Sequence, residues 1–146
     1  MQPECDLCTG VGGRHIWGGE DMRVVAVDEA EYPGFMRVIW HRHVRELTDL
    51  APAERDRLMR VVFLVEDRIR HHLSPHKMNV ASLGNVTPHV HWHLIPRFAS
   101  DPHFPGPIWA APQRAADRSR IDQTRSLLLA LEQDLAAALA ALPAAG

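Results

Sequence analysis

Short runs of β-branched and apolar residues alternate with turn residues over the first hundred positions, which predicts a set of strands. These runs cover residues 22–27, 34–40, 77–83 and 89–97. The turn pair Pro33-Gly34 separates the first two runs, so we expect them to form an antiparallel pair. Residues 1–20 hold five glycines and both cysteines and are expected to form an irregular, turn-rich arm.

Two longer segments are predicted as helices. Between residues 52 and 73, apolar side chains recur every three or four positions, at Leu58, Val61, Val62, Val65, Ile69 and Leu73. Pro52 suits the first turn of this helix. A Leu- and Ala-rich helix is expected over residues 118–142, after a proline-rich and aromatic packed loop over 98–117. The pattern therefore predicts an α+β fold, with a mostly antiparallel sheet and two helices.

Composition limits the kind of protein further. The 146 residues suit one domain, 1–146, in which the 1–20 arm precedes the strands and residues 98–146 supply the loop and last helix. A formal net charge of −2 predicts neither a nucleic-acid nor an anionic-membrane partner. No apolar run has the length of a membrane span, and the first ten residues lack the basic and apolar regions of a secretory signal. We therefore expect a cytoplasmic protein.

Histidine is the unusual residue type. The chain has ten histidines, and three of them alternate in His89-Val90-His91-Trp92-His93. Alternate residues of a strand project from one face, so the three imidazoles should share a face while Val90 and Trp92 enter the core. Three histidines in register, backed by apolar residues, indicate a functional site.

The segment HVHWHLIP resembles the signature of the histidine-triad (HIT) family. The pair Gly84-Asn85 stands where such proteins usually carry Gly-Gln, and residues 34–50 are similar to the family segment that runs Gly-x-x-x-Val-Ile-Pro-x-x-His-Val. The N-terminal CxxC is similar to that of zinc-carrying bacterial branches. The resemblance spans about residues 5–97 and implies a HIT-like fold with a five-stranded, mostly antiparallel sheet, two helices and a homodimer.

The resemblance also implies an activity. HIT proteins hydrolyse or transfer a nucleoside monophosphate from phosphoanhydride or phosphoramidate substrates, through a nucleotidyl-histidine on the middle histidine, here His91. Such an imidazole needs one nitrogen free while the other donates to a carbonyl or carboxylate. His93 would contact the α-phosphate or leaving oxygen, and Asn85, Asn79 and Ser82 are candidate substrate-binding residues. Ordinary sheet or turn hydrogen bonds remain the alternative for Asn79 and Ser82.

Four residues have the chemistry of a structural zinc site: Cys5, Cys8, His43 and His89. The CxxC spacing lets both sulfurs reach one ion, which would attach the glycine-rich arm to the histidine face. His41 rivals His43, because both share a face of a strand, and only the family segment favours His43. The alternative is that both cysteines are free thiols.

Several positions depart from the family pattern. Phe35 occupies a place where relatives often have a phosphate-contacting histidine, and Trp40 replaces the usual proline. The loop before the triad is also short. These changes leave the chemistry intact. The competing hypothesis is a non-catalytic nucleotide-binding or zinc-stabilised interaction module, although His91 and His93 are both present. A metallohydrolase is disfavoured because Trp92 and Leu94 stand where further ligands would be needed, and no P-loop motif is present.

Three aromatic side chains could stack on a nucleobase: Trp17, Phe104 and Trp109. Packing in the core or at a dimer interface is the commoner role of such residues, and we expect it here. In some relatives a C-terminal aromatic residue reaches the partner's site, and Trp109 is the candidate for that role.

Overall fold

The structure is a computed structural model that describes residues 1–143. These residues form nine helices, turns and strands. In order they are α1 (Asp6–Thr9), β1 (Arg14–Gly18), β2 (Met22–Ala26), β3 (Met36–Trp40), the 3-10 turn η1 (Leu47–Asp49), α2 (Pro52–Leu73), β4 (Lys77–Ala81), β5 (His91–Arg97) and α3 (Arg118–Ala140).

The five strands form one antiparallel sheet in the order β1-β2-β3-β5-β4. This confirms the predicted α+β class and the five-stranded sheet that the family resemblance implied. Within the region expected to be an irregular arm, Arg14–Gly18 forms the edge strand β1, so that part of the prediction was wrong. This strand lies at the edge of the sheet, is largely exposed and is flanked by glycines. Its sequence therefore lacks the apolar alternation that predicts the other strands.

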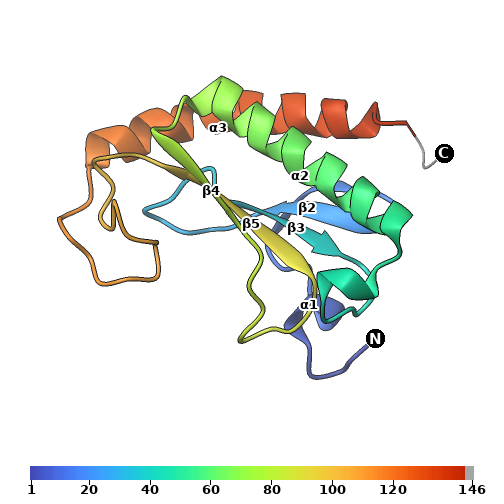
Figure 1. The fold of residues 1–146 in the computed structure, drawn as a ribbon. Coiled ribbons are helices and arrows are strands. Elements are labelled where there is room, and N and C mark those ends of the chain that lie inside the picture. Colours follow the sequence, from blue (N-terminus) through green and yellow to red (C-terminus); the bar gives the residue numbers. More distant parts are fainter. Residues whose placement is uncertain (144–146) are drawn as a thin grey trace.

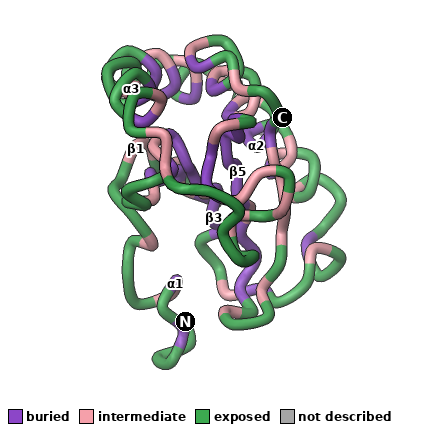
Figure 2. Tube along the Cα trace, turned by 90° about the vertical axis from the view of Figure 1, so that its left-hand side faces the viewer, coloured by how far each residue is buried: buried purple, intermediate pink, exposed green. Residues whose placement is uncertain are grey.

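Helices α2 and α3 lie side by side across one face of the sheet (Figure 1). The apolar face of α2, predicted from its three- and four-residue spacing, is buried against the strands, and the helix has the predicted bounds. Met36, Val38 and Trp40 of β3 point to this side, and Figure 2 shows the buried residues concentrated between sheet and helices. Helix α3 ends at Ala140, two residues before the predicted end.

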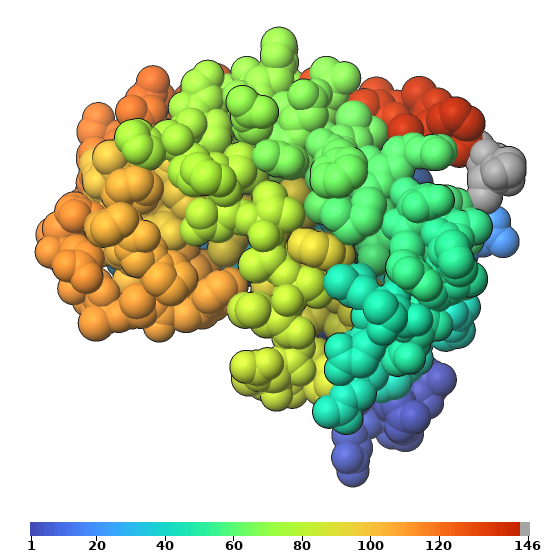
Figure 3. Space-filling view, viewed as in Figure 1, coloured from blue at the N-terminus to red at the C-terminus, as the bar shows by residue number. Residues whose placement is uncertain are grey.

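Among residues 1–143, no long helix covers the opposite face of the sheet. It is bordered by the N-terminal arm with α1, by residues 82–90 and by residues 98–117 (Figure 1). In Figure 3 the last two segments form separate projections below the helix layer. The histidines of β5 lie on this face, because Val38 and Trp92 pair on the helix side while the neighbouring positions point away from it.

Residues 98–117 form a packed loop around one buried carboxylate. Asp101 accepts hydrogen bonds from the Arg97 guanidinium at 2.8 and 3.0 Å and from the backbone N–H groups of Phe98, His103 and Phe104. Both Arg97 and Asp101 are buried. The loop is therefore fixed to the end of β5 by a desolvated ion pair.

Candidate active site and metal site

His91 is held in one tautomer by the main chain. Its Nδ1 lies 2.6 Å from the carbonyl oxygen of His89, and the side chain is buried. A carbonyl oxygen only accepts, so Nδ1 carries the proton and Nε2 is left with a free lone pair. Ser82 supports the same residue from outside, because its hydroxyl donates to the carbonyl oxygen of His91 at 2.8 Å.

The surroundings of His91 favour the neutral imidazole. Burial lowers the pKa of His91, and the nearby charge of Arg37 lowers it further, while the hydrogen bond to the His89 carbonyl acts in the opposite direction. The pKa ends below the ordinary histidine value, so the ring is unprotonated at neutral pH. His91 thus meets the electronic requirement of a nucleophile.

His93 lies beside His91, with ring centroids 4.9 Å apart. Burial, followed by the charges of His91 and Arg37, lowers the pKa of His93 to about 4. Its Nδ1 is buried and has no hydrogen-bond partner among residues 1–143. A buried ring nitrogen without a partner costs free energy, and a bound ligand could satisfy it.

Two aromatic residues enclose His93. The rings of Phe35 and Trp109 pack against it at centroid distances of 5.7 and 5.2 Å. Trp109 does not pack in the core, because 55% of the residue is exposed. Trp109 instead lies against a histidine of its own chain. Packing at a dimer interface stays a prediction. Trp17 does pack against the core.

The cysteines and two histidines meet at the start of β5. One ligand atom from each of Cys5, Cys8, His43 and His89 lies within 4.8 Å of the others. The Sγ···Nδ1 distances are 3.4 Å (Cys5 to His89), 3.5 Å (Cys8 to His89) and 3.3 Å (Cys8 to His43). Two ligands bound tetrahedrally to one zinc ion would be roughly 3.5 Å apart, so the donor set fits a metal ion.

His89 is prepared for such a role by its second nitrogen. Its Nε2 donates to the carbonyl oxygen of Trp40 at 2.6 Å, which leaves the Nδ1 lone pair directed at the sulfurs. His89 precedes β5 instead of belonging to it, so the predicted strand began two residues too early. His41 lies apart from the cluster, with Nε2 3.0 Å from the carbonyl oxygen of Gly19.

The three candidate substrate-binding residues have different surroundings. Asn79 accepts a hydrogen bond from Arg97 at 2.7 Å, and Ser82 bonds the His91 carbonyl as described above. Asn85 is exposed in the segment between β4 and β5. Their roles toward a substrate stay predictions.

Sequence reasoning missed Arg37. Residue 37 of β3 is directly opposite His93 of β5, and it lies on the histidine face. Its guanidinium carbon is 5.8 Å from the centre of the Phe35 ring. Strand alternation would have placed Arg37 on the same side as Ile39, but only the pairing of β3 with β5 brings it beside the triad.

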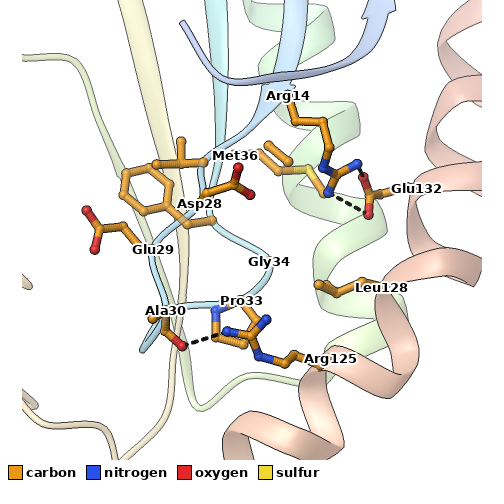
Figure 4. Close-up of a pocket in the computed structure, with 13 residues that line it drawn as sticks. Arg14, Asp28, Glu29, Ala30, Pro33, Gly34, Met36, Arg125, Leu128 and Glu132 are labelled. Carbon is orange, nitrogen blue, oxygen red and sulfur yellow. Dashed lines mark hydrogen bonds and ion pairs between the residues drawn. The ribbon is translucent and has the colours of Figure 1, made fainter.

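A separate cavity of about 290 Å³ lies between α3 and the segment that joins β2 to β3 (Figure 4). The Arg14–Glu132 ion pair borders it, and Arg125 donates to the carbonyl oxygen of Ala30. Phe35 is the residue that this cavity shares with the surroundings of His93. None of the three triad histidines lines it.

With this geometry in place, comparison with known proteins decides the family. The model of the HIT domain family matches residues 14–100, which include the triad and all five strands of the sheet. The chain belongs to the HIT family. The match begins after the CxxC and ends at residue 100, so the CxxC and residues 101–117 of the loop lie outside it.

Solved structures confirm the HIT fold. A histidine triad protein from Marinobacter aquaeolei superposes with a TM-score of 0.70 at 22% identity, over 93% of this chain and 99% of that one. A histidine triad protein from Bradyrhizobium japonicum gives a TM-score of 0.69 at 23% identity, over 86% and 92%. At these identities the likeness concerns the fold alone.

Among curated proteins, the HIT chain is similar to the AP-4-A phosphorylase of Mycobacterium tuberculosis. The two are 32% identical over 78 residues, which make up 49% of this chain. The chain spans 40% of the length of that relative.

Within residues 1–143, no helix combines the length and apolar character needed to cross a membrane.

Proposed function

We propose that this protein is a nucleotide-phosphate hydrolase or nucleotidyl transferase that works through a nucleotidyl-histidine on His91. The observation that carries the proposal is the 2.6 Å hydrogen bond from Nδ1 of His91 to the His89 carbonyl, which leaves Nε2 unprotonated. Membership of the HIT family and the likeness to AP-4-A phosphorylase support a nucleotide or dinucleotide substrate.

The reaction divides into two displacements. Nε2 of His91 attacks the α-phosphorus, the new P–N bond forms, and the bond from phosphorus to the leaving group breaks with its electron pair going to that group. A water molecule, or another acceptor in a transferase, then attacks phosphorus and releases His91. His93, with a buried unpaired nitrogen beside His91, would contact the phosphate or the leaving oxygen.

We further propose that Cys5, Cys8, His43 and His89 hold a structural zinc ion. Support comes from the interatomic distances and from the tautomer of His89, whose Nδ1 faces both sulfurs. A bound zinc would fix the arm and the residue whose carbonyl orients His91. All four ligand positions would be taken by protein atoms, so its role is structural.

The test is detection of the intermediate by intact mass. Wild type, His91→Ala and the control His71→Ala, which alters an exposed histidine of α2, are incubated with a dinucleoside polyphosphate or adenosine phosphoramidate and quenched in alkali. We expect a base-stable, acid-labile AMP adduct on wild type and the control, and none on His91→Ala. A phosphoramidate bond has this stability pattern.

Two outcomes would contradict the proposal. Turnover that survives His91→Ala would remove His91 from the chemistry. Binding of nucleotide by a folded wild type without adduct or turnover would favour the non-catalytic nucleotide-binding or zinc-stabilised module. Thermal melting of each variant separates loss of chemistry from loss of fold.

A further inference from the structure

Two half-buried arginines lie on the histidine face of the sheet, and they differ in their partners. Arg23 of β2 donates to the carbonyl oxygens of Leu7, Gly10 and Val11, so its guanidinium is committed to the arm. Arg37 of β3 makes one such bond, from Nη1 to the carbonyl oxygen of Gly12 at 3.0 Å. Its Nε is buried and has no partner among residues 1–143.

The charge of Arg37 is also uncompensated. No carboxylate of residues 1–143 forms an ion pair with it. Burial lowers the pKa of Arg37, and the charge of Glu29 offsets only part of this effect, but a guanidinium stays charged at neutral pH. The Phe35 ring offers weak compensation at 5.8 Å. A partly desolvated cation without an anion costs free energy that a bound anion would recover.

The register of the sheet places Arg37 next to the triad histidines. Arg37 is directly opposite His93, and its neighbour on the same face, Ile39, is opposite His91. Side chains directly opposite one another are about 5 Å apart at Cβ, and diagonal pairs about 7–8 Å, which is within reach of an arginine. Phosphate oxygens accept the paired N–H groups of a guanidinium.

We propose that Arg37 binds the non-bridging oxygens of the nucleotide phosphate that reacts at His91. The inference rests on the proposed function for the identity of the ligand, and it assigns the phosphate contact to a residue of β3. Phe35, which fills the place of a usual phosphate-contacting histidine, supports the Arg37 side chain instead.

The test compares binding of AMP and adenosine by isothermal titration calorimetry. We expect Arg37→Met to weaken AMP binding about 10- to 100-fold, the range for a hydrogen bond to a charged group, and to leave adenosine binding unchanged. The AMP affinity of Arg37→Lys should lie between those of wild type and Arg37→Met, because lysine keeps the charge without the paired donors. The matched control is Arg125→Met, which alters one of the two arginines of the cavity in Figure 4 and should bind AMP as wild type does.

Thermal melting distinguishes ligand binding from a purely structural role. Arg37→Met should melt at or above the wild-type temperature, because it removes an unpaired charge, whereas Arg23→Met should melt lower, because three carbonyl oxygens lose their donor. Inorganic phosphate should raise the melting temperature of wild type more than that of Arg37→Met.

The inference would be overturned by AMP affinity that is unchanged in Arg37→Met, by equal wild-type affinities for AMP and adenosine, or by a loss confined to Arg125→Met. The same experiments distinguish failure of this inference from failure of the proposed function. Phosphate-selective binding that needs Arg37, in a protein that never forms an adduct, keeps the inference and removes the chemistry. Normal adduct formation by wild type, together with unchanged AMP binding in Arg37→Met, keeps the proposed chemistry and removes the role of Arg37.

Discussion

The carbonyl oxygen of His89 lies 2.6 Å from Nδ1 of His91, so one residue connects the cluster of two cysteines and two histidines to the candidate nucleophile. The imidazole of His89 faces Cys5 and Cys8, and its main chain fixes the tautomer of His91. We therefore expect the metal and the chemistry to be coupled. Zinc removal by a strong chelator should lower turnover and also lower the melting temperature, measured on the same sample; unchanged turnover by a fully demetallated protein would contradict the coupling.

The choice between His43 and His41 can be tested by metal analysis. His43→Ala should lose most of the bound zinc, because its Nδ1 lies 3.3 Å from Cys8 Sγ, whereas His41→Ala should retain it. The Cys5→Ser, Cys8→Ser double variant should contain almost no zinc and melt roughly 10 °C lower, for a loss of about 3 kcal/mol. Equal zinc content in the two histidine variants would be evidence against the assigned ligand set.

Protonation of His93 should make stability depend on pH. Its pKa is about 4 in the folded protein, mainly because the ring is buried, and near 6.5 in an unfolded chain. As pH falls, the unfolded state therefore binds this proton first. Above about pH 6.5 the residue has no effect, and between about pH 6.5 and 4 it should remove on the order of 2–3 kcal/mol from the free energy of unfolding.

Urea denaturation across this range measures the effect. His93→Phe keeps an aromatic ring and should lose this part of the pH dependence, whereas His71→Phe, at an exposed histidine, should keep it. The same slope in His93→Phe and wild type would show that other groups cause it.

The buried ion pair between Arg97 and Asp101 should stabilise the 98–117 loop. Asp101→Asn leaves the guanidinium without its anion and should cost about 3 kcal/mol, as measured by chemical denaturation. Asp134→Asn, which changes a half-exposed carboxylate of α3 paired with His72, should remain close to wild type. Equal stability of the two variants would mean that Arg97 is satisfied by Asn79 and the Gly106 carbonyl alone.

Trp109 should control how well His93 is shielded from water. Its ring packs on His93 at 5.2 Å, so Trp109→Ala should expose the imidazole and raise the pKa of His93 from about 4 toward the ordinary value. An NMR titration of the histidine ring protons measures this shift. Phe63→Ala, at an exposed aromatic residue of α2, should leave the pKa of His93 where it is; an equal shift in both variants would exclude shielding by Trp109.

The sequence by itself determined the parts that depend on local periodicity. Apolar spacing along α2 predicted its bounds, because a helix repeats every 3.6 residues regardless of what it packs against. Alternation in β5 placed His91 and His93 on one face, and the family resemblance selected His43 over His41. Strand β1 escaped prediction because its edge position removes the apolar alternation.

Only the tertiary structure decided what depends on contacts between distant segments. The pairing of β3 with β5 placed Arg37 beside His93, and the 98–117 loop brought Trp109 onto the same ring. The carbonyl oxygens of Trp40 and His89 set the tautomers of His89 and His91. A linear pattern records which side chains share a face, but hydrogen-bond direction and cross-strand register are properties of the folded chain.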